Sequence, residues 1–281
     1  MTTDLITSPL IRLANGASMP LLGFGTWPLS DAEAGAAVVH AIDAGYRMID
    51  TAENYHNEEG IGLALARHDL ARAELFVTTK FNKEWHSFQG VRDAWDHSAT
   101  RLGVDYIDLM LIHWPNPEQG TYVQAWEGLV KLLKSGKVRA IGTSNFAPAQ
   151  LSELIDATGV VPDVNQIQFS PQWFDKERLD FHAEAGIATQ AWGSLGRGRS
   201  GLLAAAPVVE AAAAHGVTPA QAVLRWHVQH GVVPVAKTVD PQRMSENLDV
   251  FGFELDAGEM AGIDGLNGTA EDPVDPFGFG H

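Results

Sequence analysis

Four side chains with acid–base chemistry stand at or just beyond the ends of short apolar segments. Asp50 closes one such segment, and Tyr55 follows it five residues later. Lys80 ends the run LFVTTK, and His113 ends the run IDLMLIH. Segments of this kind read as buried strands, so the four groups would be brought to one edge of a sheet. We interpret Asp50, Tyr55, Lys80 and His113 as one catalytic site.

These four groups together suit proton delivery to a carbonyl oxygen. A phenol is a weak acid, with an ordinary pKa of about 10. We expect the Lys80 ammonium to lower the pKa of Tyr55, against the opposing effect of burial. Asp50 would keep Lys80 charged and oriented, and His113 can donate a hydrogen bond to the oxygen that Tyr55 protonates. None of these groups supplies a hydride, so a reduction requires a cofactor.

Composition limits the classes of partner. The 281 residues include 35 acids and only 19 Lys and Arg, a formal net charge of −16, which excludes generic nucleic-acid and anionic-membrane partners. The absence of cysteine excludes disulfides and thiol catalysis and indicates a cytoplasmic location. The amino terminus lacks the basic-then-apolar order of a signal peptide, and no apolar run approaches the roughly 18 residues of a membrane span.

Short β-rich runs alternate with helical segments along the chain. The eight runs cover residues 21–26, 46–50, 75–80, 106–113, 138–144, 163–168, 186–192 and 232–237. Helices are predicted over 32–44, from near Asn57, over 122–133, and from Thr218-Pro219 to Gly231. Alternation of this kind implies parallel strands with right-handed crossovers. Eight units favour a closed (β/α)8 TIM barrel, formed by residues 1–281 as one domain, over an open doubly wound sheet.

Two further segments lie outside this repeat. Asn15-Gly16, between two short apolar stretches, predicts an amino-terminal β-hairpin. The Gly-, Pro- and acid-rich tail, residues 268–281, is expected to lie as a loop over the barrel mouth. In barrels of this type the active site forms at the carboxyl ends of the strands. The four acid–base residues fall at such ends.

The chain resembles the aldo-keto reductase family over nearly its whole length. The segments that carry the resemblance are GFGTW, GYRMIDTAENYHNEEGIG, LFVTTK, LIHWPNP, GKVRAIGTSNF, VPDVNQIQ and KTVDPQRMSENLDVF. Within the family it is most similar to the bacterial 2,5-diketo-D-gluconate reductases. The resemblance implies that Tyr55 is the general acid, that Lys80 and Asp50 tune it, and that His113 orients the carbonyl of an aldehyde, ketone, diketone or keto-sugar. It also implies direct hydride transfer from NADPH without a metal.

The resemblance further assigns cofactor and substrate contacts. Ser144, Asn145 and Gln166 match residues that bind the nicotinamide carboxamide, and Trp192 matches the aromatic residue that stacks on the nicotinamide ring. The loop that follows Trp192 contributes Gly193, Ser194, Leu195 and Gly196. Lys237, Thr238 and Arg243 match the pocket for the adenosine 2′-phosphate, and Glu246 and Asn247 match contacts to the adenine. Trp27 and Trp114 match apolar walls of the substrate pocket. Asp240 stands in the phosphate loop where some relatives have a basic residue, and this difference is expected to weaken the preference for NADPH over NADH.

Two short motifs are set aside. Residues 196–201, GRGRSG, fit a dinucleotide fingerprint, but they follow the seventh strand rather than the first. We interpret them as a loop whose backbone, Arg197 and Arg199 cover the cofactor pyrophosphate. His227 and His230 have the spacing of a metal pair, but no third ligand is evident. We interpret them as surface or packing residues.

Two other functions remain open from the residues. Lys80 or Lys237 could form a Schiff base in an aldolase-type lyase on the same barrel. Alternatively, the chain could bind NADPH as a sensor without catalysis, although its four acid–base residues are intact. We expect a monomer that acts on a small-molecule carbonyl substrate.

Overall fold

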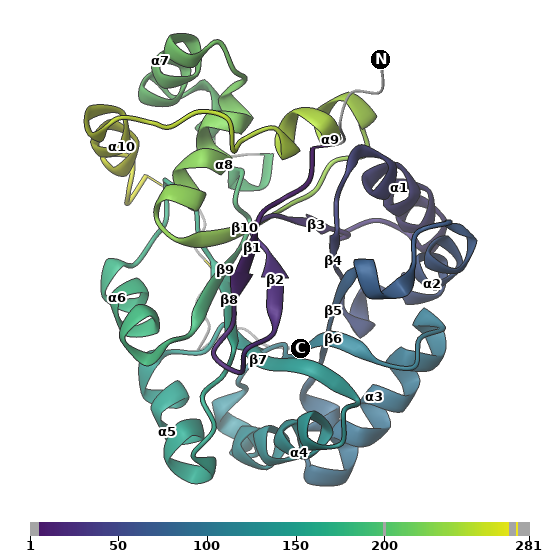
Figure 1. Cartoon of the computed structure of the whole chain (residues 1–281). Helices are drawn as coiled ribbons and strands as arrows, with labels where there is room; N and C mark the ends of the chain where they lie inside the picture. The colour runs from purple at the N-terminus through teal and green to yellow at the C-terminus, as the bar shows by residue number, and fades with distance from the viewer. Residues whose placement is uncertain (1–5, 199–200, 270–273, 275–281) are drawn as a thin grey trace.

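Eight parallel strands close into a barrel surrounded by helices. The computed structural model describes residues 6–198, 201–269 and 274. The strands follow one another around the barrel in chain order, and the last pairs with the first (Figure 1). The barrel strands are β3 (Gly23–Gly25), β4 (Met48–Asp50), β5 (Phe76–Phe81), β6 (Ile107–Ile112), β7 (Val138–Ser144), β8 (Val164–Gln168), β9 (Ala188–Trp192) and β10 (Val232–Ala236). The predicted (β/α)8 barrel is confirmed, with all eight strands in the expected segments.

Ten α-helices occur in the described residues, and most of them cover the outside of the barrel (Figure 1). They are α1 (Asp31–Ala44), α2 (Glu58–Arg67), α3 (Phe88–Leu102), α4 (Tyr122–Lys134), α5 (Pro148–Thr158), α6 (Lys176–Ala185), α7 (Ala206–His215), α8 (Pro219–Gln229), α9 (Pro241–Leu248) and α10 (Ala257–Asp264). Ser30 and Thr218 are the N-caps of α1 and α8, each within a capping box. Helix α8 starts at the predicted Thr218-Pro219, and α1 starts one residue before the predicted position 32.

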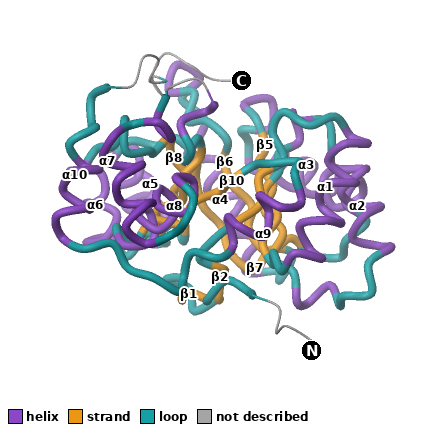
Figure 2. The backbone as a smooth tube through the Cα atoms, turned by 90° about the horizontal axis from the view of Figure 1, so that it is seen from above, coloured by secondary structure: helices purple, strands orange, loops and turns teal. Residues whose placement is uncertain are grey.

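The predicted hairpin closes the amino-terminal end of the barrel. Strands β1 (Leu10–Arg12) and β2 (Ser18–Pro20) pair antiparallel and lie across that end (Figures 1 and 2). Asn15 in the connecting turn ties the hairpin to the barrel, because its Nδ2 donates to Asp163 Oδ2 at 2.9 Å and to the Arg139 carbonyl at 2.9 Å. The opposite end, where the strands finish, is the open mouth.

The barrel interior changes from apolar to polar along the strand direction. Leu13 and Met19 of the hairpin pack with Met48, Leu109 and Leu111 inside the lower half. Side chains alternate between the two faces of a strand, so the residue two places after an inward one also points inward. Continuing the same inward rows, Asp50 follows Met48 and His113 follows Leu111. The apolar lower layers therefore form a packed floor beneath a polar upper layer.

No helix in residues 6–198, 201–269 or 274 is both long enough and apolar enough to cross a membrane.

Candidate active site

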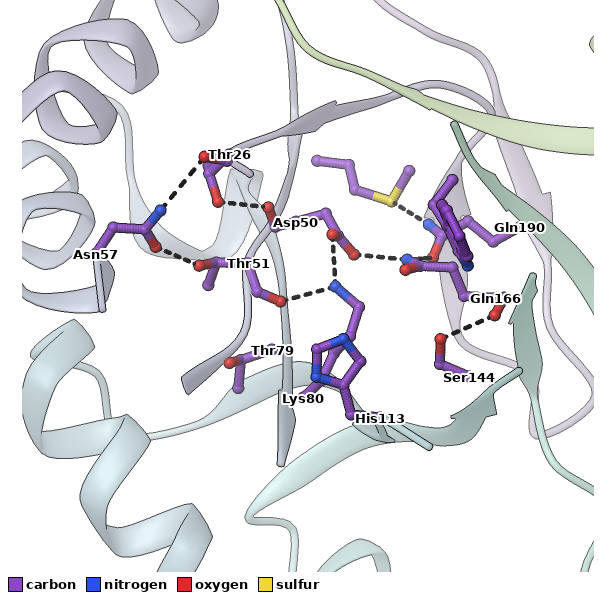
Figure 3. A network of polar contacts seen from close by, with 12 residues as sticks. Thr26, Asp50, Thr51, Asn57, Thr79, Lys80, His113, Ser144, Gln166 and Gln190 are labelled. Carbon is purple, nitrogen blue, oxygen red and sulfur yellow. Dashed lines mark hydrogen bonds and ion pairs between the residues drawn. The ribbon is translucent and has the colours of Figure 1, made fainter. Parts of the chain in front are cut away.

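A buried ion pair lies at the centre of the upper layer. Lys80 Nζ at the end of β5 donates to Asp50 Oδ1 at 2.6 Å and to the Thr51 carbonyl at 2.9 Å (Figure 3). The Lys80 side chain is fully buried and that of Asp50 is 5% exposed. Burial lowers the pKa of the Lys80 ammonium, but Asp50 and Tyr55 together outweigh it and hold the pKa above its ordinary value. Lys80 is therefore a fixed cation beneath the mouth.

Tyr55 lies over this cation on a short 3-10 turn, Glu53–Tyr55. Lys80 Nζ is 5.1 Å from the centroid of the Tyr55 ring. The net pKa of Tyr55 is raised, which corrects the expectation of a lowered value. Burial raises the pKa of the phenol by more than attraction to, and a hydrogen bond with, Lys80 lower it, and the Asp50 charge adds to the rise. Tyr55 is thus held in its protonated form.

His113 comes to the same place from the end of β6. Its ring centroid is 5.8 Å from that of Tyr55, with the two planes at 70°. Its Nδ1 is 3.0 Å from Asn82 Oδ1, and its backbone carbonyl accepts from Asn145 Nδ2 at 3.1 Å. The structure therefore brings Asp50, Tyr55, Lys80 and His113 together, although 63 positions separate Asp50 from His113 along the chain.

The amide and hydroxyl groups assigned to the nicotinamide line the mouth next to these four residues. Ser144 Oγ at the end of β7 donates to the Gln166 carbonyl at 2.9 Å, and Trp192 Nε1 donates to Asn145 Oδ1 at 2.9 Å. Gln166 Nε2 donates to Asp50 Oδ2 at 2.7 Å. Asn145 Nδ2 also donates to Ser144 Oγ at 3.0 Å, so these residues form one chain of hydrogen bonds that reaches the carboxylate of Asp50 through Gln166.

Gln190 is part of this polar layer and was not identified from the sequence. It is fully buried on β9, and its Oε1 accepts from Gln166 Nε2 at 2.6 Å (Figure 3). Its own amide lies 3.5 Å from the Met48 sulfur. The available signal was an amide within the strand segment GIATQAW, two positions before Trp192 and therefore on the same face.

Three tryptophans surround the acid–base groups. Trp27 is 59% exposed, and its ring centroid is 5.1 Å from that of Tyr55. Trp114 is buried, stacks on His113 at 6.2 Å, and meets Trp192 edge-on at 6.5 Å. Trp27 and Trp114, the two residues matched to the substrate pocket, therefore stand on the side of the site nearest the phenol and the imidazole.

The remaining cofactor positions extend from Trp192 to the start of α9. In the loop after β9, Gly193 has φ of 68°, and Ser194 Oγ donates to the Val235 carbonyl at 3.0 Å. Leu195 and Gly196 follow it, and Arg197 Cζ lies 6.0 Å from the Trp192 ring centroid. Arg199, the other arginine expected to cover the pyrophosphate, lies outside the described residues.

Two cations flank the amino end of α9. Lys237 is exposed and precedes the helix, and the Arg243 side chain is 72% exposed in its first turn. Asp240 caps the helix, accepting from the Gln242 and Arg243 backbone nitrogens at 2.9 and 3.4 Å. Thr238 Oγ1 accepts from the Asp240 nitrogen at 3.1 Å. Further along α9, Glu246 is half-buried and Asn247 is buried.

The two histidines that were set aside belong to α8 and its C-cap rather than to the strand ends. His227 is fully buried, with Nδ1 2.8 Å from the Val223 carbonyl and Nε2 3.2 Å from the Phe169 carbonyl. His230 Nε2 is 2.9 Å from Asp264 Oδ1. Within the described part of the chain, no group of three or more His, Asp or Glu side chains is arranged to hold a metal. Most of the expected loop over the mouth lies outside the described residues; Val274 donates its backbone NH to Gln168 Oε1 at 2.8 Å.

Comparison with known proteins identifies relatives along most of the chain. The family model for the Aldo/keto reductase family matches residues 21–268. The 2,5-diketo-D-gluconic acid reductase B of Corynebacterium sp. (strain SHS752001) is 45% identical over 258 residues, covering 92% of this chain and 93% of that protein. Morphine 6-dehydrogenase of Pseudomonas putida is 41% identical over 280 residues, covering 96% and 95%.

A solved structure agrees with the whole architecture. The crystal structure of a mutant of Gox0644 in complex with NADPH superposes with a TM-score of 0.91 at 41% identity, covering 96% of this chain and 98% of that one. The match of both sequence and fold extends across the strands that carry Asp50, Lys80 and His113. This chain belongs to the aldo-keto reductase family.

Proposed function

We propose that this enzyme reduces aldehyde or ketone carbonyls to alcohols with NADPH, with Tyr55 as the general acid. The observation that carries the proposal is the placement of Tyr55 against a buried, charged Lys80, whose Nζ is 2.6 Å from Asp50 Oδ1 and 5.1 Å from the phenol ring centroid. Substrates named by the relatives, a diketo sugar acid and an alkaloid alcohol, support keto-sugars, diketones and cyclic ketones as the compounds to test.

The proton moves from the Tyr55 hydroxyl to the carbonyl oxygen. Bound NADPH supplies the hydride to the carbonyl carbon, so the products are an alcohol and NADP⁺. Because the pKa of Tyr55 is raised, the phenol holds its proton until a stronger base, the developing alkoxide, forms beside it. Lys80 then stabilises the phenolate that remains, and Asp50 keeps Lys80 charged and in place. His113 holds the substrate against Tyr55.

The donor set at the mouth suits a nicotinamide dinucleotide. Ser144, Asn145 and Gln166 offer a hydroxyl and two amides, which match the donor and acceptor of a carboxamide. The half-buried Trp192 offers an aromatic face beside them. In a chain of net charge −16, Lys237 and Arg243 concentrate positive charge at a helix amino end, where a phosphate is favoured.

The preference for NADPH over NADH is expected to be modest. The Asp240 carboxylate occupies the amino end of α9 and lies 3.8 Å from Arg243 Nε. It therefore competes with a 2′-phosphate for both the helix dipole and the guanidinium. Arg243→Ala should raise the KM for NADPH while leaving the KM for NADH nearly unchanged, and Asp240→Ser should lower the KM for NADPH.

The burial and charge of Lys80 argue against the lyase alternative. A Schiff base forms from a neutral, accessible amine. Lys80 is fully buried, ion-paired and has a raised pKa, so its amine is protonated and shielded. Lys237 is exposed and lies between β10 and α9.

We also expect a cytoplasmic monomer. The absence of cysteine supports a cytoplasmic location, and the strong net negative charge supports a monomer. Light scattering of the purified protein would test the oligomeric state.

Replacement of Tyr55 by phenylalanine tests the function directly. Tyr55→Phe should lower the kcat for carbonyl reduction by about 10²–10⁴-fold, because the proton donor is lost. NADPH binding, read by quenching of tryptophan fluorescence, should persist. Tyr106→Phe is the matched control, since Tyr106 precedes β6 at the opposite end of the barrel and its hydroxyl makes only a 3.5 Å contact with the Arg72 carbonyl.

The assay follows NADPH oxidation, with NADH alongside, across aldehydes, α-keto esters, diketones and keto-sugars. Comparable turnover by wild type and Tyr55→Phe would refute the role of the phenol. Tight NADPH binding with no turnover of any carbonyl in the panel would instead favour a sensor.

A further inference from the structure

Asn57 begins helix α2, but its side chain makes no contact with that helix of the kind expected there. It is the N-cap of α2, a position at which an Asn side chain commonly accepts a hydrogen bond from a backbone NH of the first turn. No such bond forms, although the side chain is fully buried. Buried polar groups are almost always hydrogen-bonded. The amide of Asn57 is therefore bonded to other segments of the chain.

The nitrogen of this amide spans the turn that carries Trp27. Asn57 Nδ2 donates to the Leu29 carbonyl at 3.1 Å and, more weakly, to the Thr26 carbonyl at 3.4 Å (Figure 3). These two residues are the ends of the turn, because the Leu29 NH donates to the Thr26 carbonyl at 2.8 Å. Trp27 lies inside the turn, and more than half of its surface is exposed. Its position therefore depends on the turn, which Asn57 ties to the barrel.

The oxygen of the same amide closes the loop that carries Tyr55. Asn57 Oδ1 accepts from Thr51 Oγ1 at 2.6 Å, and Tyr55 ends the 3-10 turn between these two residues (Figure 3). Thr51 is itself fixed, because its carbonyl accepts from Lys80 Nζ at 2.9 Å. One buried side chain thus joins the Tyr55 loop to the Trp27 turn, next to the Lys80 cation.

This link sets the distance between an exposed indole and the phenol. The Trp27 ring centroid is 5.1 Å from that of Tyr55, with the two planes tilted by 48°. A substrate whose carbonyl meets the Tyr55 hydroxyl can therefore cover part of the Trp27 indole. We propose that Asn57 is a positioning residue that fixes the Trp27 indole against Tyr55, and that it acts on the substrate through this indole. The inference rests on the proposed function for the substrate, but not for the placement of Trp27.

The placement of Trp27 is measured without substrate by ¹⁹F NMR of enzyme labelled with 5-fluorotryptophan. Trp27→Phe assigns the Trp27 signal by its loss. In the wild type this signal should lie away from its position in the urea-unfolded protein. Asn57→Ser removes the amide but keeps a residue favoured at an N-cap, so α2 should persist. In this variant the Trp27 signal should move toward the unfolded position. A wild-type signal already at that position overturns the proposal, even if Asn57→Ser does not fold.

Thr218→Ala is the matched control. Its hydroxyl does cap a helix, accepting from the Gln221 nitrogen of α8 at 3.3 Å. Its loss should lower stability by about 1 kcal/mol without moving the Trp27 signal. An equal movement of the Trp27 signal in Thr218→Ala would show that general destabilisation, and not the Asn57 amide, is responsible.

The effect on the reaction is read from ethyl benzoylformate and ethyl pyruvate, two α-keto esters that carry a phenyl or a methyl group on the ketone. The ratio of kcat/KM for the first over the second should fall by about 2–10-fold in Asn57→Ser, the loss of about one aromatic contact. It should hold in Thr218→Ala. In a Trp27→Ala background, Asn57→Ser should not change the ratio further, because the indole through which it acts is absent.

A purely structural role for Asn57 gives a different pattern, in which both esters lose kcat/KM equally, with or without Trp27. An unchanged or higher ratio in Asn57→Ser, or the same fall in both backgrounds, therefore overturns the action through Trp27. If neither ester is reduced with NADPH by the wild type, the proposed function is contradicted instead, and the ¹⁹F signal still decides the role of Asn57.

Discussion

Removal of the charge on Asp50 should destabilise the protein far more than removal of an equally short ion pair on the surface. In Asp50→Asn the fully buried Lys80 ammonium loses its counter-ion. The amide introduced by this substitution also turns a donor toward either Lys80 or Gln166, both of which donate to Asp50 in the wild type. Breaking a buried pair by removing one partner costs about 3–5 kcal/mol.

The control is Asp180→Asn on α6. Asp180 pairs with Lys176 at 2.7 Å, but the two side chains are 55% and 75% exposed. An exposed pair of this kind contributes only about 0.3–0.5 kcal/mol. Urea unfolding followed by tryptophan fluorescence gives both free energies. At about 2–4 °C per kcal/mol, the melting temperature of Asp50→Asn should fall by about 10 °C, while that of Asp180→Asn should hardly move.

Two further experiments distinguish the loss of charge at Asp50 from a loss of packing. The double variant with Lys80→Met should be less destabilised than Asp50→Asn alone, because no uncompensated charge remains. The penalty of Asp50→Asn should also shrink as pH rises toward the ordinary pKa of lysine, about 10.5. Burial lowers the pKa of Lys80 once Asp50 no longer opposes it, so the amine can become neutral there. A cost for Asp50→Asn no larger than that for Asp180→Asn, at every pH, would refute this reasoning.

Two other predictions concern Glu53 and Gly45. Burial raises the pKa of Glu53 from 4.5 to about 7, because the hydrogen bonds from Asn82 and Trp85 only partly offset the desolvation of the carboxylate. The folded state therefore binds the Glu53 proton more tightly than the unfolded state does. The free energy of unfolding should therefore decrease by up to about 3 kcal/mol as the pH rises from 4.5 to about 7. In Glu53→Gln this part of the pH dependence should be absent. Parallel curves of unfolding free energy against pH for the wild type and Glu53→Gln would contradict the prediction. Gly45 ends α1 with φ of 114°, and an added Cβ would lie 2.1 Å from the Ile6 carbonyl oxygen. Gly45→Ala should lower the free energy of unfolding, measured in urea, by more than about 2 kcal/mol. Gly103 is the control: its φ is 63° and no atom lies within 4 Å of the added Cβ, so Gly103→Ala should lower it by only about 1–2 kcal/mol. Equal losses in the two variants would argue against the clash at Gly45.

Much of the fold was determined by local sequence patterns. The alternation of short apolar runs with capped helical segments predicted the eight barrel strands, because strand and helix periods are properties of neighbouring residues. The strand ends likewise placed Asp50, Lys80 and His113 at one edge, since parallel strands bring their carboxyl ends together. The hairpin around Asn15-Gly16 followed from its turn residues in the same way.

The tertiary structure decided what these groups do to one another. Gln190 contacts Gln166, which contacts Asp50 across 116 positions of sequence, and only barrel closure creates that chain of amides. The sign of the net pKa change at Tyr55 was predicted wrongly, because it depends on the balance between desolvation, which raises the pKa, and the charge of Lys80, which lowers it. The contact between Asn82 and His113 likewise arises from register between neighbouring strands. The sequence determined which side chains reach the mouth, but solvation and side-chain direction depend on packing from every side, so the electrostatics of the site were determined only by the folded chain.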